Sequence, residues 1–219
     1  CAITFLIVIH EIGHFLMVYL LGGEIHKILI YPLGGISKFS TSYNISLVKE
    51  LIILVFGPLF QILGWFLLIH LFPEKEILIS TYHYGILFFN LLPIYPLDGG
   101  KLLCLIFHTV CSYKKAFYFT FCIGNLLLFC FLVFTVLSFS LNVFFLSIFL
   151  LVKLTREYQQ IPYFYERFLL ERYLNHYCFK KSKLIKNTDN FYRGYRHLIK
   201  EGDFYYLEDE YLEKKYKSC

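Results

Sequence analysis

The chain has 219 residues, of which 58% are hydrophobic, 21% aromatic and 17% charged. Soluble domains average about 45–50% apolar and about 25% charged residues, so this composition excludes an ordinary soluble globule, and it also excludes intrinsic disorder. Residues 1–152 contain seven Lys and Arg with six Asp and Glu, whereas residues 153–219 contain fourteen and ten. We therefore predict an all-α polytopic membrane protein with a transmembrane helical core and a small charged tail.

Five apolar segments have close to the roughly 20 residues that a helix needs to cross the hydrocarbon core of a bilayer. They cover residues 1–21, 48–72, 78–98, 116–137 and 139–154. We expect the third helix to be broken near its end, because Pro93 and Pro96 remove backbone donors and Gly99–Gly100 follows them.

Lysine and arginine gather in alternate connections, and cytoplasmic loops are the ones that retain positive charge. The connections 22–47 and 99–115 are cationic, and so is the tail. We therefore expect these parts to be cytoplasmic, with an odd number of crossings and with residue 1 on the other side. On this interpretation a further helix is expected before residue 1.

The first span contains His10-Glu11-Ile12-Gly13-His14. Residues four apart share one helix face, so both imidazoles can bind one metal ion while Glu11 acts as a base toward water. A catalytic zinc site usually has three protein ligands, and Asp98 is the expected third, because a metal would offset the burial of a carboxylate among aliphatic neighbours. The simpler alternatives are a polar patch satisfied by helix packing and, for Asp98, an ordinary Asp-Gly turn.

These motifs resemble the site-2 protease family of intramembrane zinc metalloproteases. The resemblance covers about residues 1–112 and rests on four features: His-Glu-x-x-His, the stretch Asn90–Gly100 with its Asn-x-x-Pro and Asp-Gly, Gly57-Pro58, and Pro32-Leu-Gly34-Gly35. The amino-acid sequences of Phe89–Lys101 and of Ile161–Tyr173 are similar to those of the sporulation branch of that family.

The resemblance implies that His10, His14 and Asp98 bind one Zn²⁺ per chain, that Glu11 is the catalytic acid and base, and that Asn90 helps to hold the substrate. It also implies a membrane-associated protein substrate, such as a sigma-factor precursor during sporulation, and inhibitory membrane proteins as partners. The protein would then lie in the bacterial cell membrane or in the membrane around the forespore. Gln61 stands where the family often has Asn, and the tail is too short for the nucleotide-binding CBS domain that many members carry.

The loop from Ile28 to Phe39 contains Gly34 and Gly35, and we hypothesise that it binds an extended substrate by strand addition. We expect three regions: a transmembrane metalloprotease domain at 1–154, an amphipathic linker along the anionic leaflet at 155–179, and a small cytosolic tail at 180–219. Within the tail, Glu201-Gly202-Asp203 is expected to form a turn. No nucleic-acid recognition module is visible, so nucleic acid is not expected as a partner.

The main alternative function is a polytopic metal-ion transporter in which His10, His14 and Asp98 coordinate the transported cation. Glu11 favours the protease, because transport would not need a general base beside two helical ligands. An inactive scaffold for membrane partners is disfavoured because all four catalytic positions are filled. The other six histidines lack metal spacing and are expected to be structural or solvated. The sequence does not define an oligomeric state.

Overall fold

The computed structural model of the chain describes residues 2–22, 24–31, 34–40, 43–138, 141–186 and 189–217. The chain divides into two compact units. One comprises Cys1–Leu92 with Leu97–Gly99, and the other comprises Pro93–Pro96 with Gly100–Cys219. Each unit is described by itself.

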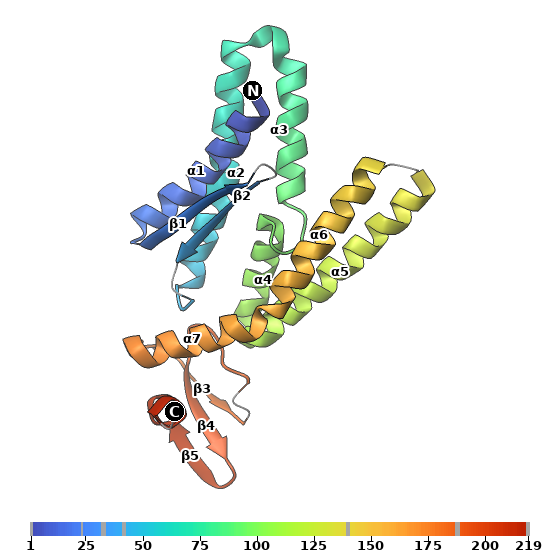
Figure 1. Ribbon diagram of the computed structural model, residues 1–219. Helices are drawn as coiled ribbons and strands as arrows, with labels where there is room; N and C mark the ends of the chain where they lie inside the picture. Colours follow the sequence, from blue (N-terminus) through green and yellow to red (C-terminus); the bar gives the residue numbers. More distant parts are fainter. Residues whose placement is uncertain are drawn as a thin grey trace. The chain divides into compact units, whose positions relative to one another are not determined.

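The first unit holds three long helices, a β-hairpin and a short 3₁₀ turn (Figure 1). Its elements are α1 (Ala2–Leu20), β1 (Glu24–Tyr31), β2 (Gly34–Ser40), α2 (Leu47–Leu71), η1 (Pro73–Lys75) and α3 (Glu76–Asn90). Ser46 is the N-cap of α2, and its side chain accepts a hydrogen bond from the backbone N–H of Lys49 in the first turn. Leu6, Leu68 and Ile79 form a buried cluster where the three helices meet.

The helices α1 and α2 cross closely because glycine lies at the crossing. A Cβ atom on Gly13 would stand 2.4 Å from the carbonyl oxygen of Phe56, and one on Gly64 would stand 2.8 Å from Cγ2 of Ile9. Lipid gives helices little hydrophobic reason to associate, so close backbone approach at small residues is a main source of their contact energy. The position of α1 against α2 therefore depends on these glycines.

The expected loop from Ile28 to Phe39 folds as an antiparallel hairpin. Ile30 pairs with Gly35 and Tyr31 with Gly34, while the register shifts between Glu24 and Lys27. The turn residues Pro32 and Leu33 lie outside the described residues. Among the described residues the sheet has two strands, so each strand is paired along one edge only.

The break in the third apolar segment is confirmed, but its cause differs in part from the expectation. The helix α3 ends at Asn90, residues 91–97 are not helical, and α4 (Asp98–Val110) begins at Asp98. Gly99 and Gly100 lie inside the first turn of α4 and do not interrupt a helix. A Cβ atom on Gly99 would stand 2.1 Å from the carbonyl oxygen of Leu91, so this glycine lets the new helix approach the chain that precedes it.

Three of the described helices are long and apolar enough to cross a membrane: Ala2–Leu20, Leu47–Leu71 and Tyr113–Thr135. They correspond to the first, second and fourth expected spans. The third yields α3, whose 15 residues reach about 22 Å at 1.5 Å per residue, less than the roughly 30 Å of hydrocarbon. The fifth yields α6 (Leu141–Gln159), whose last turns carry Lys153, Arg156 and Glu157.

The second unit contains α4 from Gly100 onward, the antiparallel pair α5 (Tyr113–Ser138) and α6, and a small mixed domain (Figure 1). That domain consists of α7 (Ile161–Asn175), β3 (Ser182–Ile185), β4 (Arg196–Glu201), β5 (Phe204–Leu207) and α8 (Glu208–Lys217). The strand β4 lies in the middle of the sheet, parallel to β3 and antiparallel to β5. The expected turn at 201–203 is confirmed, with Gly202 at φ +64°.

The small domain is fastened to the start of α5. The ring of Tyr113 stacks on Phe168 with ring centroids 4.3 Å apart, and its backbone N–H donates to the carbonyl oxygen of Phe191 at 2.8 Å. Lys114 pairs with Asp189 at 2.5 Å. The apolar side of α7 is buried in these contacts, and Phe168 and Leu169 have almost no exposed surface.

Candidate metal centre

His10 and His14 lie one turn apart on the face of α1 that packs inward. Both are buried, with exposed fractions of 2% and 4%, and their Nε2 atoms lie 3.2 Å apart. Isolated buried imidazoles are expensive inside an apolar helix bundle. Their convergence on one point confirms that the spacing in the sequence places both on one helix face.

Asp98 reaches the same point from the first residue of α4. Its Oδ2 atom lies 2.9 Å from Nε2 of His10 and 3.1 Å from Nε2 of His14. The broken segment before α4 turns the chain so that this carboxylate, 8% exposed, faces the two rings. Among the described residues these three side chains form the single group of His, Cys, Asp or Glu able to hold a metal ion.

The proton on His14 can be assigned from its other ring nitrogen. Nδ1 of His14 lies 2.8 Å from the backbone carbonyl oxygen of Ile53 on α2. A carbonyl oxygen only accepts hydrogen bonds, so Nδ1 must carry the proton and donate. In the neutral ring this leaves a lone pair on Nε2, the atom that faces His10 and Asp98.

The side chain of Gln61 shows which ring nitrogen of His10 carries the proton. Nε2 of Gln61 donates to the backbone carbonyl oxygen of His83 at 3.0 Å, which fixes the orientation of the amide. Its Oε1 atom therefore faces Nδ1 of His10 at 2.9 Å and accepts a hydrogen bond from it. Nε2 of His10 is left as an acceptor, like that of His14.

The three converging atoms are thus all acceptors: two imidazole lone pairs and a carboxylate oxygen. With neutral imidazoles and an ionised carboxylate, none of these three atoms carries a proton, so the contacts among them are not hydrogen bonds. Their separations of 2.9, 3.1 and 3.2 Å approach the roughly 3.3–3.4 Å between tetrahedral zinc ligands at about 2.0–2.1 Å. Two imidazoles and one carboxylate are also a donor set that zinc accepts while keeping a fourth position open. The residues therefore fit a zinc ion.

Gly57 on α2 lies directly against the ring of His14. A Cβ atom at this position would stand 2.2 Å from Nε2 of His14 and 2.3 Å from its Cε1 atom. Any side chain would displace the ring from the point where it meets Asp98. The Gly57-Pro58 pair in the second span therefore shapes the site directly.

Asn90 and Glu11 lie near the three ligands in different ways. Nδ2 of Asn90, at the last residue of α3, lies 3.5 Å from Nε2 of His10, so the structure brings this residue to the edge of the cluster. Glu11 is half-buried on α1, three residues before His14 and therefore its neighbour along the helix surface. Gly34 and Gly35 are not part of the cluster; they lie on β2, paired with Tyr31 and Ile30.

Sequence reasoning missed that Gln61 and the Ile53 carbonyl orient the two imidazoles. Gln61 is fully buried and lies 51 positions from His10, so no local spacing relates them. The single hint was that Gln occupies this position in an otherwise apolar segment. A buried amide in such a helix must find hydrogen-bonding partners, so a lone Gln among apolar residues indicates a polar contact with another helix.

A second buried histidine–carboxylate cluster lies in the small domain of the second unit. We call Arg172, His197 and Glu208 the tail network. Arg172 donates to Oε1 of Glu208 at 2.7 Å, and Nδ1 of His197 donates to Oε2 at 2.9 Å. Nε2 of His197 accepts from the backbone N–H of Tyr192 at 2.9 Å. Both ring nitrogens of His197 thus have hydrogen-bonding partners, as a structural histidine requires.

Burial and pairing shift the pKa values in the tail network. Burial lowers the pKa of His197, against the opposing effect of Glu208, so the neutral ring is favoured. Burial alone would raise the pKa of Glu208, but the hydrogen bond from His197 and the charge of Arg172 together lower it. The network therefore holds a neutral imidazole between a carboxylate and a backbone N–H.

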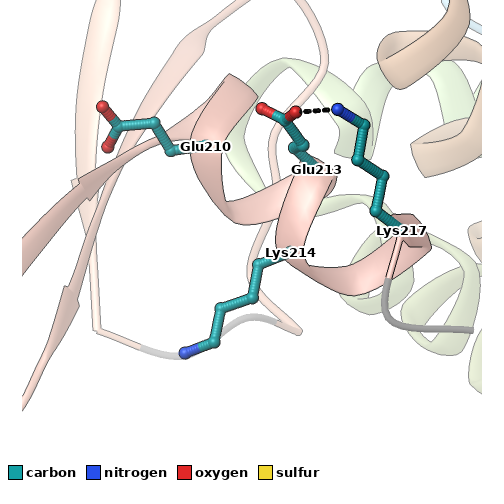
Figure 2. Close-up of a pocket in the computed structure, with 4 residues that line it drawn as sticks. All are labelled: Glu210, Glu213, Lys214 and Lys217. Carbon is teal, nitrogen blue, oxygen red and sulfur yellow. Dashed lines mark hydrogen bonds and ion pairs between the residues drawn. The ribbon is translucent and has the colours of Figure 1, made fainter.

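An open depression on the surface of α8 is lined by Glu210, Glu213, Lys214 and Lys217. Figure 2 shows Glu213 and Lys217 joined by an ion pair one helical turn apart, while the side chains of Glu210 and Lys214 point away. Charges of both signs spaced along a single exposed helix are typical of a solvated surface. We assign this depression no function.

No family model matches the chain. It is 36% identical over 182 residues to stage IV sporulation protein FB of Bacillus subtilis (strain 168), covering 77% of this chain and 61% of that protein. It is 32% identical over 155 residues to a zinc metalloprotease of Methanocaldococcus jannaschii, covering 65% of this chain and 44% of that protein. The chain therefore spans less than two thirds of either relative.

A solved structure, that of a site-2 protease from Methanocaldococcus jannaschii, is also similar to this fold. The two superpose with a TM-score of 0.61 at 26% sequence identity, over 72% of this chain and 76% of the other. Both sequence relatives and the structural neighbour are proteases or sporulation proteins by name.

Proposed function

Because the chain belongs to the site-2 protease family of intramembrane zinc metalloproteases, we propose that it hydrolyses a peptide bond of a membrane-associated protein. His10, His14 and Asp98 would hold one zinc ion. The observation that carries this proposal is the convergence of three acceptor atoms, 2.9–3.2 Å apart, in a buried site beside Glu11.

When bound, zinc supplies a water molecule with a pKa of about 7 and polarises the peptide carbonyl. Glu11 would take the proton from the attacking water and return it to the leaving amine nitrogen. The hydrogen bonds from His10 to Gln61 and from His14 to Ile53 would hold both rings still during these steps. The amide of Asn90, at the edge of the cluster, would hold the substrate or an intermediate.

A helical substrate must unwind before its peptide carbonyl becomes accessible. An extended segment could then add as a third strand to the β1–β2 hairpin, using the backbone of Gly34 and Gly35 or the opposite edge. In such pairing the main chain supplies affinity for many sequences, and side-chain pockets supply selectivity. Pro in place of Gly34 and Gly35 is expected to reduce cleavage.

The membrane setting and the biological role follow from the same proposal. We assign residues 1–154 to the transmembrane protease domain and residues 155–219 to the cytoplasmic side, on the basis of the charge asymmetry in the sequence. The stretch 155–179, expected as a linker, includes α7, which packs within the small domain and is part of it. The likeness to stage IV sporulation protein FB supports a role in sporulation. A sigma-factor precursor as substrate and inhibitory membrane proteins as regulators are what the family resemblance implies.

Co-expression with a membrane-tethered precursor tests the proposal. The variant Glu11→Gln removes the base and leaves the three ligands, so cleavage should fall by about 10²–10⁴-fold while zinc is retained. The matched control is Glu74→Gln, which makes the same change at an exposed position in η1. The shorter product is followed by blotting. Equal product from wild type and Glu11→Gln would contradict the assignment of Glu11.

A further inference from the structure

Gln61 is a fully buried amide in a helix that otherwise presents apolar side chains to the same region. Burying an amide is unfavourable unless both of its ends form hydrogen bonds. Here both ends do: Oε1 accepts from Nδ1 of His10, and Nε2 donates to the carbonyl oxygen of His83. The side chain thus bridges α1 and α3 from its place on α2.

The α3 end of this bridge is held firmly. The ring of His83 stacks on Trp65 with centroids 4.8 Å apart and planes 12° apart. Nε1 of Trp65 donates to Oγ of Ser80, one turn before His83, at 3.0 Å. Because the His83 carbonyl belongs to the backbone of this braced turn, it fixes which way the Gln61 amide points.

The two imidazoles of the metal centre are therefore oriented by different means. A backbone carbonyl, that of Ile53, orients His14, and no substitution of Ile53 would remove it. A side chain orients His10, so the orientation depends on the residue at position 61. A partner that accepts from the outer nitrogen of a ligating histidine fixes its tautomer and raises its basicity toward the metal.

We propose that Gln61 is a positioning residue for zinc: by accepting from Nδ1 of His10, it keeps the lone pair of Nε2 aimed at the metal. This inference rests on the proposed zinc function of His10, His14 and Asp98. It gives position 61 a defined requirement, namely an acceptor at the end of a side chain as long as glutamine.

Two substitutions of similar length separate this role from simple packing. Gln61→Met keeps the volume but has no oxygen, so the proton on Nδ1 of His10 loses its acceptor. Gln61→Glu keeps an oxygen facing His10 whether or not its carboxyl is protonated. Zinc affinity of the full chain in detergent, measured by competition with a chromophoric chelator, should fall about 10–100-fold in Gln61→Met. In Gln61→Glu it should change by less than about tenfold.

Two further variants complete the experiment. Leu68 lies on the same helix as Gln61 and packs against Leu6 and Ile79. Leu68→Ala leaves a cavity in that cluster but changes no residue of the metal site, so it is a control for loss of packing. Its zinc affinity should match wild type even though the zinc-free protein melts at a lower temperature. His14→Ala tests the zinc site itself and should lose zinc binding.

The outcomes are distinct. Wild-type affinity in Gln61→Met, with loss in His14→Ala, would overturn the role of Gln61 and leave the zinc site standing. Equal losses in Gln61→Met, Gln61→Glu and Leu68→Ala would reduce Gln61 to a packing residue and also overturn the proposal. Wild-type affinity in His14→Ala would reject the zinc site, and the proposal with it.

Discussion

The two buried histidine–carboxylate clusters of this chain differ in how their hydrogen-bonding atoms match. In the tail network, Glu208 receives protons from Arg172 and His197, and the remaining nitrogen of His197 receives one from a backbone N–H. In the metal centre, the outer nitrogens of His10 and His14 give their protons to Gln61 and Ile53. The inner atoms, with Asp98, are then all acceptors.

This difference shows how a metal site can be told from a structural cluster of the same residue types. Burial and proximity are shared, since His10, His14, Asp98, His197 and Glu208 are all less than 9% exposed. The two clusters differ in whether the atoms that face each other carry protons to share. A cluster whose donors and acceptors match stabilises a fold, whereas one in which several acceptors face each other offers a site for a cation.

The largest effect is expected when the tail network is opened. Glu208→Ala leaves the Arg172 guanidinium buried without its carboxylate, which should destabilise the small domain by about 3–5 kcal/mol. Hydrogen exchange of the full chain in detergent should show faster exchange in β4 and α8. Zinc affinity should be unchanged.

A double variant sharpens the same comparison. Replacing both charges, with Arg172→Met and Glu208→Leu, removes the unpaired charge and should recover part of the lost protection. Recovery should be incomplete, because His197 loses its acceptor and the carbonyl oxygens of Tyr192 and Tyr195 lose a donor. Protection no better than in Glu208→Ala would contradict the view that the unpaired charge of Arg172 causes the loss.

An intermediate effect is expected at Gly57. In Gly57→Ala the new Cβ atom would collide with the His14 ring, so zinc affinity should fall by at least about 100-fold, the upper end of the losses seen for supporting residues. The control is Gly85→Ala on α3, where a new Cβ atom would meet no heavy atom within 4 Å. It should keep zinc. Equal zinc affinities in the two variants would contradict the placement of His14.

The smallest effect is a pH dependence confined to the small domain. The pKa of His197 is lowered from 6.5 in the folded chain, so its contribution to stability is complete above about pH 6.5 and is lost as the pH falls toward the lowered pKa. The loss is at most about 1.4 kcal/mol per pH unit for one proton. Glu208, whose pKa is lowered from 4.5, should add to it only in more acidic solution.

Hydrogen exchange of β4 and α8 at pH 7.5 and 5.5, corrected for intrinsic rates, measures this effect. His197→Phe removes the titrating ring and should abolish the difference between the two pH values. A wild-type domain equally stable at both would show that protonation of His197 is not opposed by the fold.

The helical core and most of the metal centre could be predicted from the sequence. Two histidines four apart must share a helix face, and a carboxylate in an apolar segment needs a partner, so His10, His14 and Asp98 were identifiable without a structure. Asn90 was suggested only by the family resemblance, because nothing in its spacing from the histidines places it near them.

The remaining features depend on packing between distant segments. Gln61 reaches His10 only because α1 and α2 cross at glycines, and that crossing has no local signature. The tail network joins α7, β4 and α8. The strands of the small domain have four to six residues, too few for a clear alternation of apolar and polar residues in the sequence. Charge and aromatic content indicated a folded tail segment but not which of its charges would be buried.

Zinc content is the most direct test of the central claim that the acceptor-only cluster, and not the self-satisfied one, binds metal. The full chain and the variants Asp98→Ala and Glu208→Ala would be purified in detergent, dialysed against a weak chelator and analysed for zinc by mass spectrometry. We predict one zinc per chain in wild type and in Glu208→Ala, and loss of zinc in Asp98→Ala. Equal zinc in both variants would contradict the assignment of the site.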